Sequence, residues 1–128
     1  MSESKKSGEA FSENEMRFDP DVRCVVICSA ESGNPVTSVT ETFYRYTGYT
    51  PGEVIGRSLS MLHGPDTSPE AVDMFRYLIH SGESGKVKIL NYAKDGTPFW
   101  HHCEIRPISN GSGELTHFIC VQRPESLD

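Results

Sequence analysis

The sequence has no long hydrophobic run. A membrane-spanning helix needs about 20 apolar residues in succession, and a secretory signal needs an apolar centre. The chain has neither, and its first residues, MSESKKSGEAFSENE, are polar. These absences predict a cytoplasmic protein that has no membrane as a partner.

An excess of positive charge is also lacking. The 128 residues include 12 Lys+Arg and 18 Asp+Glu, which give a net charge of -6, and the charges are scattered along the chain. Because a polyanion is held by a basic surface, this balance excludes DNA and RNA as partners. A chain of this length forms one domain and buries a core without covalent staples.

Metal and catalytic spacings are absent too. The four cysteines are Cys24, Cys28, Cys103 and Cys120, and no C-x-x-C or H-x₃-H pair accompanies them. We therefore expect no zinc site. Two disulfides are conceivable, but a reducing compartment favours free thiols. With no nucleophile beside a base, no phosphate loop and no paired acids, we expect a protein that is not an enzyme.

What is present is an order of strands and helices. Residues 1–21 are predicted to be a flexible segment, 22–124 the folded domain and 125–128 a short tail. Within the domain, β-branched runs, turn signals and helix caps predict strands at 23–30 and 36–40, helices at 41–49, 50–56 and 68–82, and strands at 86–94, 98–108 and 115–123. This order predicts an α+β fold, with a five-stranded antiparallel sheet and helices on one face.

Alternation along the last three strands places polar side chains on the inner face. Asn91, His101 and Gln122 share that face with mostly apolar neighbours. Burying an amide without a partner costs about 1–3 kcal/mol, so each side chain needs a hydrogen bond. A flat heterocycle with several edge donors and acceptors would supply these bonds. Bonds among the three side chains, or to trapped water, would serve equally.

The outer face of the same strands carries an apolar strip, which predicts a covered surface. We expect a homodimer through this face, with the N-terminal segment folding back as the alternative cover. The strip consists of Leu90, Tyr92, Trp100, Ile119 and Val121.

Three motifs resemble those of a known family. They are TSVTETFYRYTGYTPGEVIGRSLSMLHGPDT, LNYAKDGTPFWHHCEIRPI and HFICVQ, and they are similar to a PAS domain of the light-oxygen-voltage (LOV) type over roughly residues 22–124. The resemblance implies a PAS fold that binds a flavin, FMN or FAD, between helices and sheet. It implies that Asn91 contacts the pyrimidine edge, Gln122 senses the N5 and O4 region, and Arg76 binds the phosphate.

The chain departs from the family motif at several positions. The usual GRNCRFLQGP reads GRSLSMLHGP here, so Leu59 replaces the photoactive cysteine, and Ser58, Ser60 and His63 replace an asparagine, an arginine and a glutamine. His101 replaces the asparagine of the FWN motif. The resemblance then implies a site of Ser58, Leu59, His63, Arg76, Asn91, His101 and Gln122.

Leucine offers no nucleophile, so we expect no cysteinyl–flavin adduct. Photoreduction or redox sensing remains, with Cys28 as one conceivable electron donor. Output would act in trans, because the chain has no room for an output domain and its signalling partner is unknown. The alternative is a PAS module without a cofactor that serves protein interaction or dimerisation, similar to the PAS caps of ether-à-go-go-type potassium channels.

Overall fold

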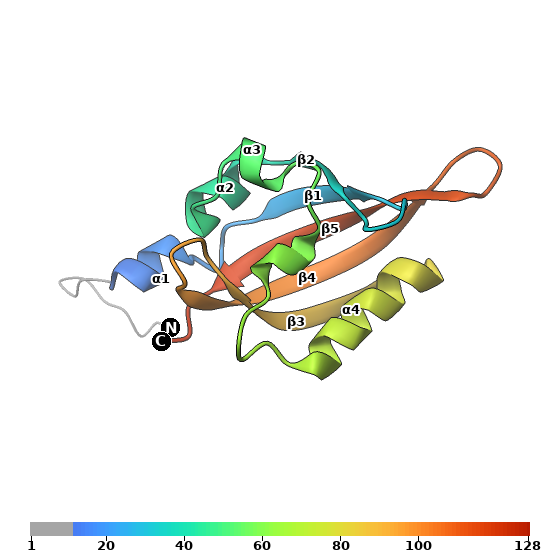
Figure 1. The fold of residues 1–128 in the computed structure, drawn as a ribbon. Coiled ribbons are helices and arrows are strands. Elements are labelled where there is room, and N and C mark those ends of the chain that lie inside the picture. The colour runs from blue at the N-terminus through green and yellow to red at the C-terminus, as the bar shows by residue number, and fades with distance from the viewer. Residues whose placement is uncertain (1–11) are drawn as a thin grey trace.

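A five-stranded antiparallel sheet forms the centre of the computed structural model, which describes residues 12–128 (Figure 1). The strand order is β2-β1-β5-β4-β3, so β1 and β5, the first and last strands in the sequence, lie side by side. The prediction of an α+β fold with this sheet is confirmed. The strands are β1 (Cys24–Ser29), β2 (Val36–Val39), β3 (Gly85–Tyr92), β4 (Pro98–Ser109) and β5 (Leu115–Glu125).

Between β2 and β3, the chain crosses one face of the sheet as a series of helices. These are α2 (Glu41–Thr47), α3 (Pro51–Val54), the 3₁₀ helix η1 (Leu59–Leu62) and α4 (Pro69–Ser81). The three predicted helices form within their predicted ranges, but each ends one or two residues before its predicted end. Helix α2 ends at Gly48, whose φ of 81° is a left-handed conformation that glycine adopts without strain, and Thr50 forms a capping box with Glu53 at the start of α3.

The N-terminal segment differs from its prediction. Residues 1–11 lie outside the described part of the chain, but residues 12–21 are not the flexible lead-in that their polar composition suggested. A short helix, α1 (Glu13–Arg17), begins with a capping box at Ser12. Phe18 then enters the core with 1% of its surface exposed, and its ring stacks on Phe99 with centroids 4.6 Å apart. The burial of this one aromatic ring fixes the segment on the core in spite of its polar composition.

Strand β5 runs further than predicted. It continues to Glu125, so Pro124 lies opposite His101 and Glu125 opposite Trp100. Pro124 lacks an N–H group to donate, and it is accommodated next to the last residue of the strand. Strand β3, in contrast, stops at Tyr92, two residues earlier than predicted.

The predicted inner face of the sheet is buried. Asn91, His101 and Gln122 all have less than 5% of their surface exposed, and their apolar neighbours along each strand are buried with them. Thr116, which falls on the same face by strand alternation, is only half-buried because it lies at the start of β5. The remaining core is formed by helix side chains such as Phe43 and Leu62.

The side chains of the outer strip are less exposed than their pattern suggested. All five of its residues are half-buried, and the Lys88 ammonium lies 4.7 Å from the centre of the Trp100 ring. Tyr92 turns around the edge of the sheet, packs so closely on Gly64 that no Cβ would fit there, and accepts a hydrogen bond from the Asp66 N–H at 3.0 Å. The loop around Gly64 therefore covers Tyr92 within the same chain, whereas the prediction left this residue to a partner protomer or the N-terminal segment. The described N-terminal residues pack on the inner side, against Phe99 and Tyr46, and do not cover the strip.

Within residues 12–128, no helix has the length and apolar character required to cross a bilayer.

Candidate functional site

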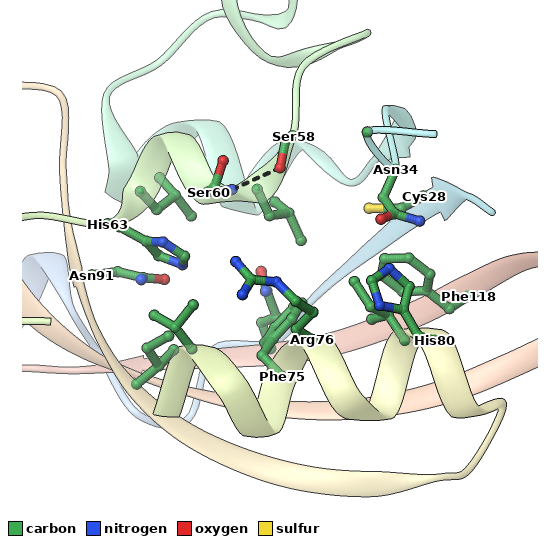
Figure 2. Close-up of a pocket in the computed structure, with 17 residues that line it drawn as sticks. Cys28, Asn34, Ser58, Ser60, His63, Phe75, Arg76, His80, Asn91 and Phe118 are labelled. Carbon is green, nitrogen blue, oxygen red and sulfur yellow. Dashed lines mark hydrogen bonds between the residues drawn. The ribbon is translucent and has the colours of Figure 1, made fainter. Parts of the chain in front are cut away.

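A cavity of about 210 Å³ lies between helix α4, the η1 segment and the sheet (Figure 2). Its walls include six of the seven predicted site residues, which are Ser58, Leu59, His63, Arg76, Asn91 and Gln122. The structure therefore brings these six residues to one cavity. The seventh residue, His101, does not line the cavity.

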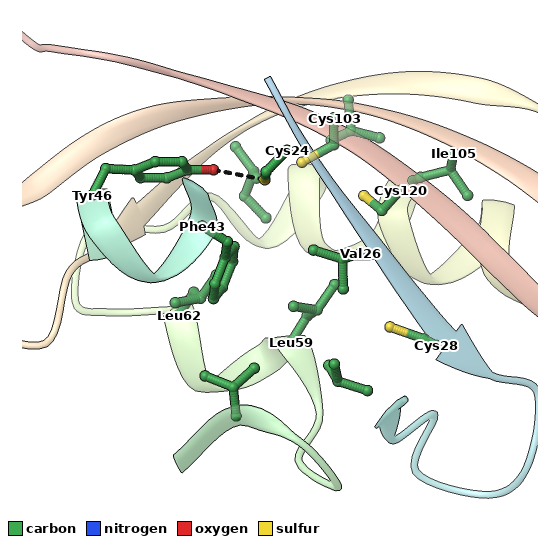
Figure 3. Close-up of a cluster of buried hydrophobic side chains, with 14 of the residues drawn as sticks. Cys24, Val26, Cys28, Phe43, Tyr46, Leu59, Leu62, Cys103, Ile105 and Cys120 are labelled. Atoms are coloured by element: carbon green, nitrogen blue, oxygen red, sulfur yellow. Dashed lines mark hydrogen bonds between the residues drawn. The ribbon is translucent and has the colours of Figure 1, made fainter. Parts of the chain in front are cut away.

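The η1 helix forms the roof. The Ser58 side chain caps it by accepting a hydrogen bond from the Ser60 N–H at 3.1 Å, which fixes the turn on which Leu59 is presented. Leu59 is 8% exposed and belongs both to the cavity wall and to the main hydrophobic cluster (Figure 3). This position presents an isobutyl group, and no reactive atom, to any ligand below the roof.

The mouth of the cavity is cationic. Arg76 comes from α4, and its guanidinium lies between the roof and the helix in Figure 2. Its side chain is 62% exposed, and its ion pair with Asp73 is long, at 3.8 Å. His63 points toward it from the roof side, and burial together with the Arg76 charge lowers the pKa of His63. An anionic ligand group at the mouth would meet one guanidinium and a neutral imidazole.

Gln122 is a buried amide without a strong partner among residues 12–128. Its side chain is 2% exposed, and its Nε2 donates only to sulfur, at 3.2 Å to Cys120 and 3.4 Å to Cys103. Its Oε1 faces the Cys24 thiol at 3.7 Å. Thiols are weak donors and weak acceptors, so this carboxamide retains hydrogen-bonding capacity at the cavity wall.

Asn91 and His101 are paired with each other. The His101 Nδ1 lies 2.9 Å from the Asn91 Oδ1, and its Nε2 lies 2.6 Å from the Tyr46 hydroxyl. Burial lowers the pKa of His101 to about 3, with a smaller contribution from His102, so the imidazole is neutral. Of the explanations left open for these polar groups, bonding among themselves thus holds for this pair. His101 lies behind Asn91 and orients it.

All four cysteines are free and buried. Burial raises the pKa of Cys24 and of Cys28 to about 12, and the pKa of Cys120 is raised by its interaction with the Cys103 thiol and by burial. The thiolate is the reactive form, so these groups are poor nucleophiles. Figure 3 shows the sulfur atoms along the sheet side of the core, across from Leu59. No cluster of three or more His, Cys, Asp or Glu side chains suited to a metal occurs in the described part of the chain.

Tyr46 is the member of this region that sequence reasoning missed. Its helical spacing with Phe43 and Thr47 is typical of a buried helix face, and all three are buried. The pattern could not show that its hydroxyl meets His101 and the Cys24 sulfur, because those residues come from β4 and β1. A phenol on an apolar helix face requires a buried partner, and that requirement was the available signal.

A family model described as "PAS domain" matches residues 22–123. The fold and the inner-face site therefore define a PAS-class protein. Among curated proteins, the chain is 37% identical over 95 residues to a blue-light-activated histidine kinase of Brucella anthropi, and 39% identical over 98 residues to phototropin-1A of Oryza sativa subsp. japonica. These alignments cover 74% and 77% of the chain but only 19% and 11% of those proteins.

Two solved structures agree. One, described as concerning a flavin analogue and the mechanism of a light-oxygen-voltage domain, has a TM-score of 0.78 and 35% identity over 84% of this chain and 81% of that one. The light-state LOV domain of the blue-light photoreceptor Aureochrome1 has a TM-score of 0.78 and 30% identity over 92% and 91%. The chain belongs to the PAS domain family and, within it, to the LOV type.

The residues present fit the chemistry of a flavin. Asn91 and Gln122 offer amides to a polar edge, the walls are mainly apolar, and Arg76 stands at the mouth. Ligand pockets usually measure about 300–1,000 Å³, so the cavity of about 210 Å³ is small for such a ligand. Because the exposed Arg76 side chain projects into this space, its outward rotation would enlarge the cavity without moving the backbone.

Proposed function

We propose that the chain is a sensory module that binds a flavin between helix α4 and the sheet and responds to blue light or redox state, without catalysing a reaction of its own. The observation that carries the proposal is Gln122, a buried amide on the cavity wall with sulfur partners only. A heterocycle with an acceptor and a donor on one edge is the ligand that this amide lacks. The blue-light relatives support the same assignment.

Each site residue has a task in this proposal. Asn91, held by His101, presents its amide to the pyrimidine edge, and Gln122 faces the N5 and O4 region. Arg76 binds the phosphate of FMN or FAD, while Ser58, Leu59 and His63 close the roof over the ring. When bound, the flavin supplies absorption of blue light and acceptance of electrons. The protein supplies orientation, exclusion of water and a reorienting amide at Gln122.

We propose that light does not produce a carbon–sulfur bond in this chain. Leu59 occupies the position of the reactive cysteine and has no nucleophilic atom. Cys28 also lines the cavity, but it lies on β1, and burial holds its pKa at about 12. Electron transfer to the flavin is the remaining photochemistry, and the signal passes in trans to a partner protein.

Reconstitution with FMN, FAD and riboflavin tests binding. The expected product is yellow, with a structured absorption band in the blue. Illumination should reduce the flavin slowly and should not produce the reversible bleaching of an adduct. A Leu59→Cys variant should gain reversible bleaching, whereas Leu62→Cys, on the same η1 helix and also lining the cavity, should not. A protein that binds none of the three flavins would overturn the proposal, and adduct bleaching in the unaltered chain would overturn its second part.

A PAS module without cofactor is the second candidate. It is favoured by the small cavity and by the completed bonds of Asn91, His101 and Tyr46. In that case, saturating flavin would leave the thermal midpoint of unfolding unchanged, whereas a ligand that binds only the folded state must raise it.

We also propose that the outer sheet face mediates homodimerisation through Leu90, Trp100, Ile119 and Val121. These side chains are half-buried in one protomer and would bury further apolar surface against a second copy. In analytical ultracentrifugation, Ile119→Glu should shift the protein toward monomer. Met74→Glu, at an exposed apolar position on α4, should not. An unchanged dimer in Ile119→Glu would assign the interface elsewhere.

A further inference from the structure

A chain of side-chain hydrogen bonds runs behind the cavity wall, from β3 to β1. It joins the Asn91 Oδ1 to the His101 Nδ1 at 2.9 Å, the His101 Nε2 to the Tyr46 Oη at 2.6 Å, and that hydroxyl to the Cys24 sulfur at 3.1 Å. Tyr46 is 3% exposed and His101 is fully buried. The phenol and the imidazole are shielded from water, and neither lines the cavity, so they do not hold a ligand directly.

The acceptors in this chain fix where the protons are. The Asn91 carboxamide directs its NH₂ group to the Leu90 carbonyl, so its oxygen faces the imidazole and can only accept. The His101 Nδ1 must then carry the ring proton. The Nε2 has a free lone pair, and the Tyr46 hydroxyl donates to it. The phenol O–H therefore donates a hydrogen bond to a neutral imidazole.

In the ground state this proton stays on oxygen. Burial lowers the pKa of His101 to about 3, and burial together with the nearby Cys24 raises the pKa of Tyr46 well above its ordinary value. Only loss of an electron makes a phenol acidic enough to protonate such a base. The pair is therefore inert until it is oxidised.

Resting on the proposed function, we infer that Tyr46 and His101 form a proton-coupled electron donor to the photoexcited flavin. One electron leaves the Tyr46 phenol and reduces the flavin by one equivalent, and the phenol proton moves to the His101 Nε2. The products are a neutral tyrosyl radical, an imidazolium and a flavin that carries one more electron. The reverse transfer restores both residues.

The bonds already present would stabilise these products. The imidazolium would donate from Nε2 to the tyrosyl oxygen and from Nδ1 to the Asn91 Oδ1, so no partner has to move. Two routes connect the pair to the cavity wall. His101 contacts the wall residue Asn91 directly, and Tyr46 reaches the wall residue Gln122 through Cys24. A new charge at His101 would therefore be felt by both amides that face the ligand.

Among the described residues, the other oxidisable side chains lack a buried base close to the cavity. The Tyr92 hydroxyl accepts a hydrogen bond from the Asp66 N–H. Tyr77 donates to the Glu83 carboxylate, but it is 53% exposed and does not line the cavity. Trp100 lies on the outer side of the sheet, under Lys88. Cys28 is on the cavity wall, but burial raises its pKa to about 12, and the described residues place no base beside it. This comparison leaves Tyr46 as the preferred donor.

The protein without flavin provides the first test. In ¹⁵N-labelled protein, the His101 ring should show a protonated Nδ1 and an accepting Nε2 at neutral pH. Tyr46→Phe should shift the Nε2 resonance toward that of a free acceptor, whereas Tyr44→Phe, on the same helix and only half-buried, should leave it in place. A protonated Nε2 in the unaltered protein would overturn the inference.

The second test uses protein loaded with FMN. A flash should generate a tyrosyl radical, detected by transient absorption and electron paramagnetic resonance, and its formation should slow in D₂O. Tyr46→Phe should abolish the radical and His101→Leu should abolish the D₂O effect, while Tyr44→Phe retains both. An undiminished radical in Tyr46→Phe would overturn this inference and leave the proposed function intact. Failure of the unaltered chain to bind any flavin would overturn both.

Discussion

Two ends of one sheet face differ in how their polar groups are satisfied. At the closed end, near Phe18 and Phe99, Asn91 and His101 have oxygen and nitrogen partners at 2.9 Å or less. At the open end, Gln122 has only sulfur partners, and Arg76 has one long ion pair. The closed end packs against α2 and the segment that holds Phe18, whereas the open end lies under η1 and α4.

The difference indicates where the protein completes its own interactions and where it leaves them to a ligand. A native core seldom buries an amide with weak partners unless another molecule contributes to its bonding. The closed end provides rigid support for Asn91, and the open end provides the contact surface. Four measurements would break or sharpen this contrast.

The largest effect should come from the aromatic anchor of the closed end. Phe18→Ala removes a fully buried ring that stacks on Phe99 and should lower the free energy of unfolding by about 3–5 kcal/mol. Chemical denaturation followed by circular dichroism measures the loss. Met16→Ala, on the adjacent helix at a position 68% exposed, should change stability by no more than about 0.5 kcal/mol. Equal effects would mean that the N-terminal segment is not anchored by Phe18.

The two amides should respond differently to the same substitution. Asn91→Leu leaves the buried His101 Nδ1–H without an acceptor and should cost about 1–3 kcal/mol of stability in the protein without flavin. Gln122→Leu removes an amide bonded only to thiols, and its cost should be below about 1 kcal/mol. If denaturation shows a larger loss for Gln122→Leu, the contrast between the two ends is wrong.

The buried imidazole should make stability depend on pH. The pKa of His101 is about 3 in the folded protein, against an ordinary value of 6.5. At a pH above the ordinary value, the imidazole is neutral in both the folded and the unfolded chain, so it contributes nothing to the pH dependence of stability. Between these values only the unfolded chain takes up the proton, so stability falls as pH falls, by at most about 1.4 kcal/mol per pH unit from this group.

Denaturation midpoints at successive pH values from neutral to mildly acidic measure this slope. A His101→Asn variant should show a shallower dependence over the same interval, whatever its absolute stability. Identical slopes in the two proteins would mean that His101 titrates normally in the folded state.

The smallest effect should come from the mouth of the cavity. Arg76→Ala removes an exposed cation, so its loss should weaken FMN binding by about 1 kcal/mol, or roughly fivefold. Riboflavin has no phosphate and should bind both proteins equally. Arg106→Ala removes an arginine that is paired with Glu104 on the other side of the sheet, and serves as the matched control. Isothermal titration measures all six affinities, and a parallel loss for riboflavin would exclude a phosphate role.

Much of the fold could be predicted because the signals were local. The hairpin, the capped helices α2, α3 and α4, and the inner face of the sheet follow from periodicity and from residues such as Thr50 and Gly48. The burial of Phe18 could not be predicted in this way, because its partner Phe99 is 81 residues away and only the folded sheet places them together.

The site was predictable to the same extent. Strand alternation, together with the family motifs, placed Asn91 and Gln122 on one wall, and the motif around Leu59 gave the roof. Which polar groups bond to each other depends on side-chain positions across α2, β1 and β4. The hydrogen bond between His101 and the Tyr46 hydroxyl, behind the cavity wall, could therefore be found only in the three-dimensional structure.

The loop after η1 connects the roof to the edge of the sheet. Thr67 donates to the Leu90 carbonyl at 2.7 Å, the Tyr92 hydroxyl accepts from the Asp66 N–H, and the Tyr92 ring occupies the space where Gly64 lacks a side chain. These contacts join the roof to the edge strand, so we expect a displacement of Leu59 to be transmitted to β3. A larger residue at Gly64 would displace the Tyr92 ring and should weaken that connection.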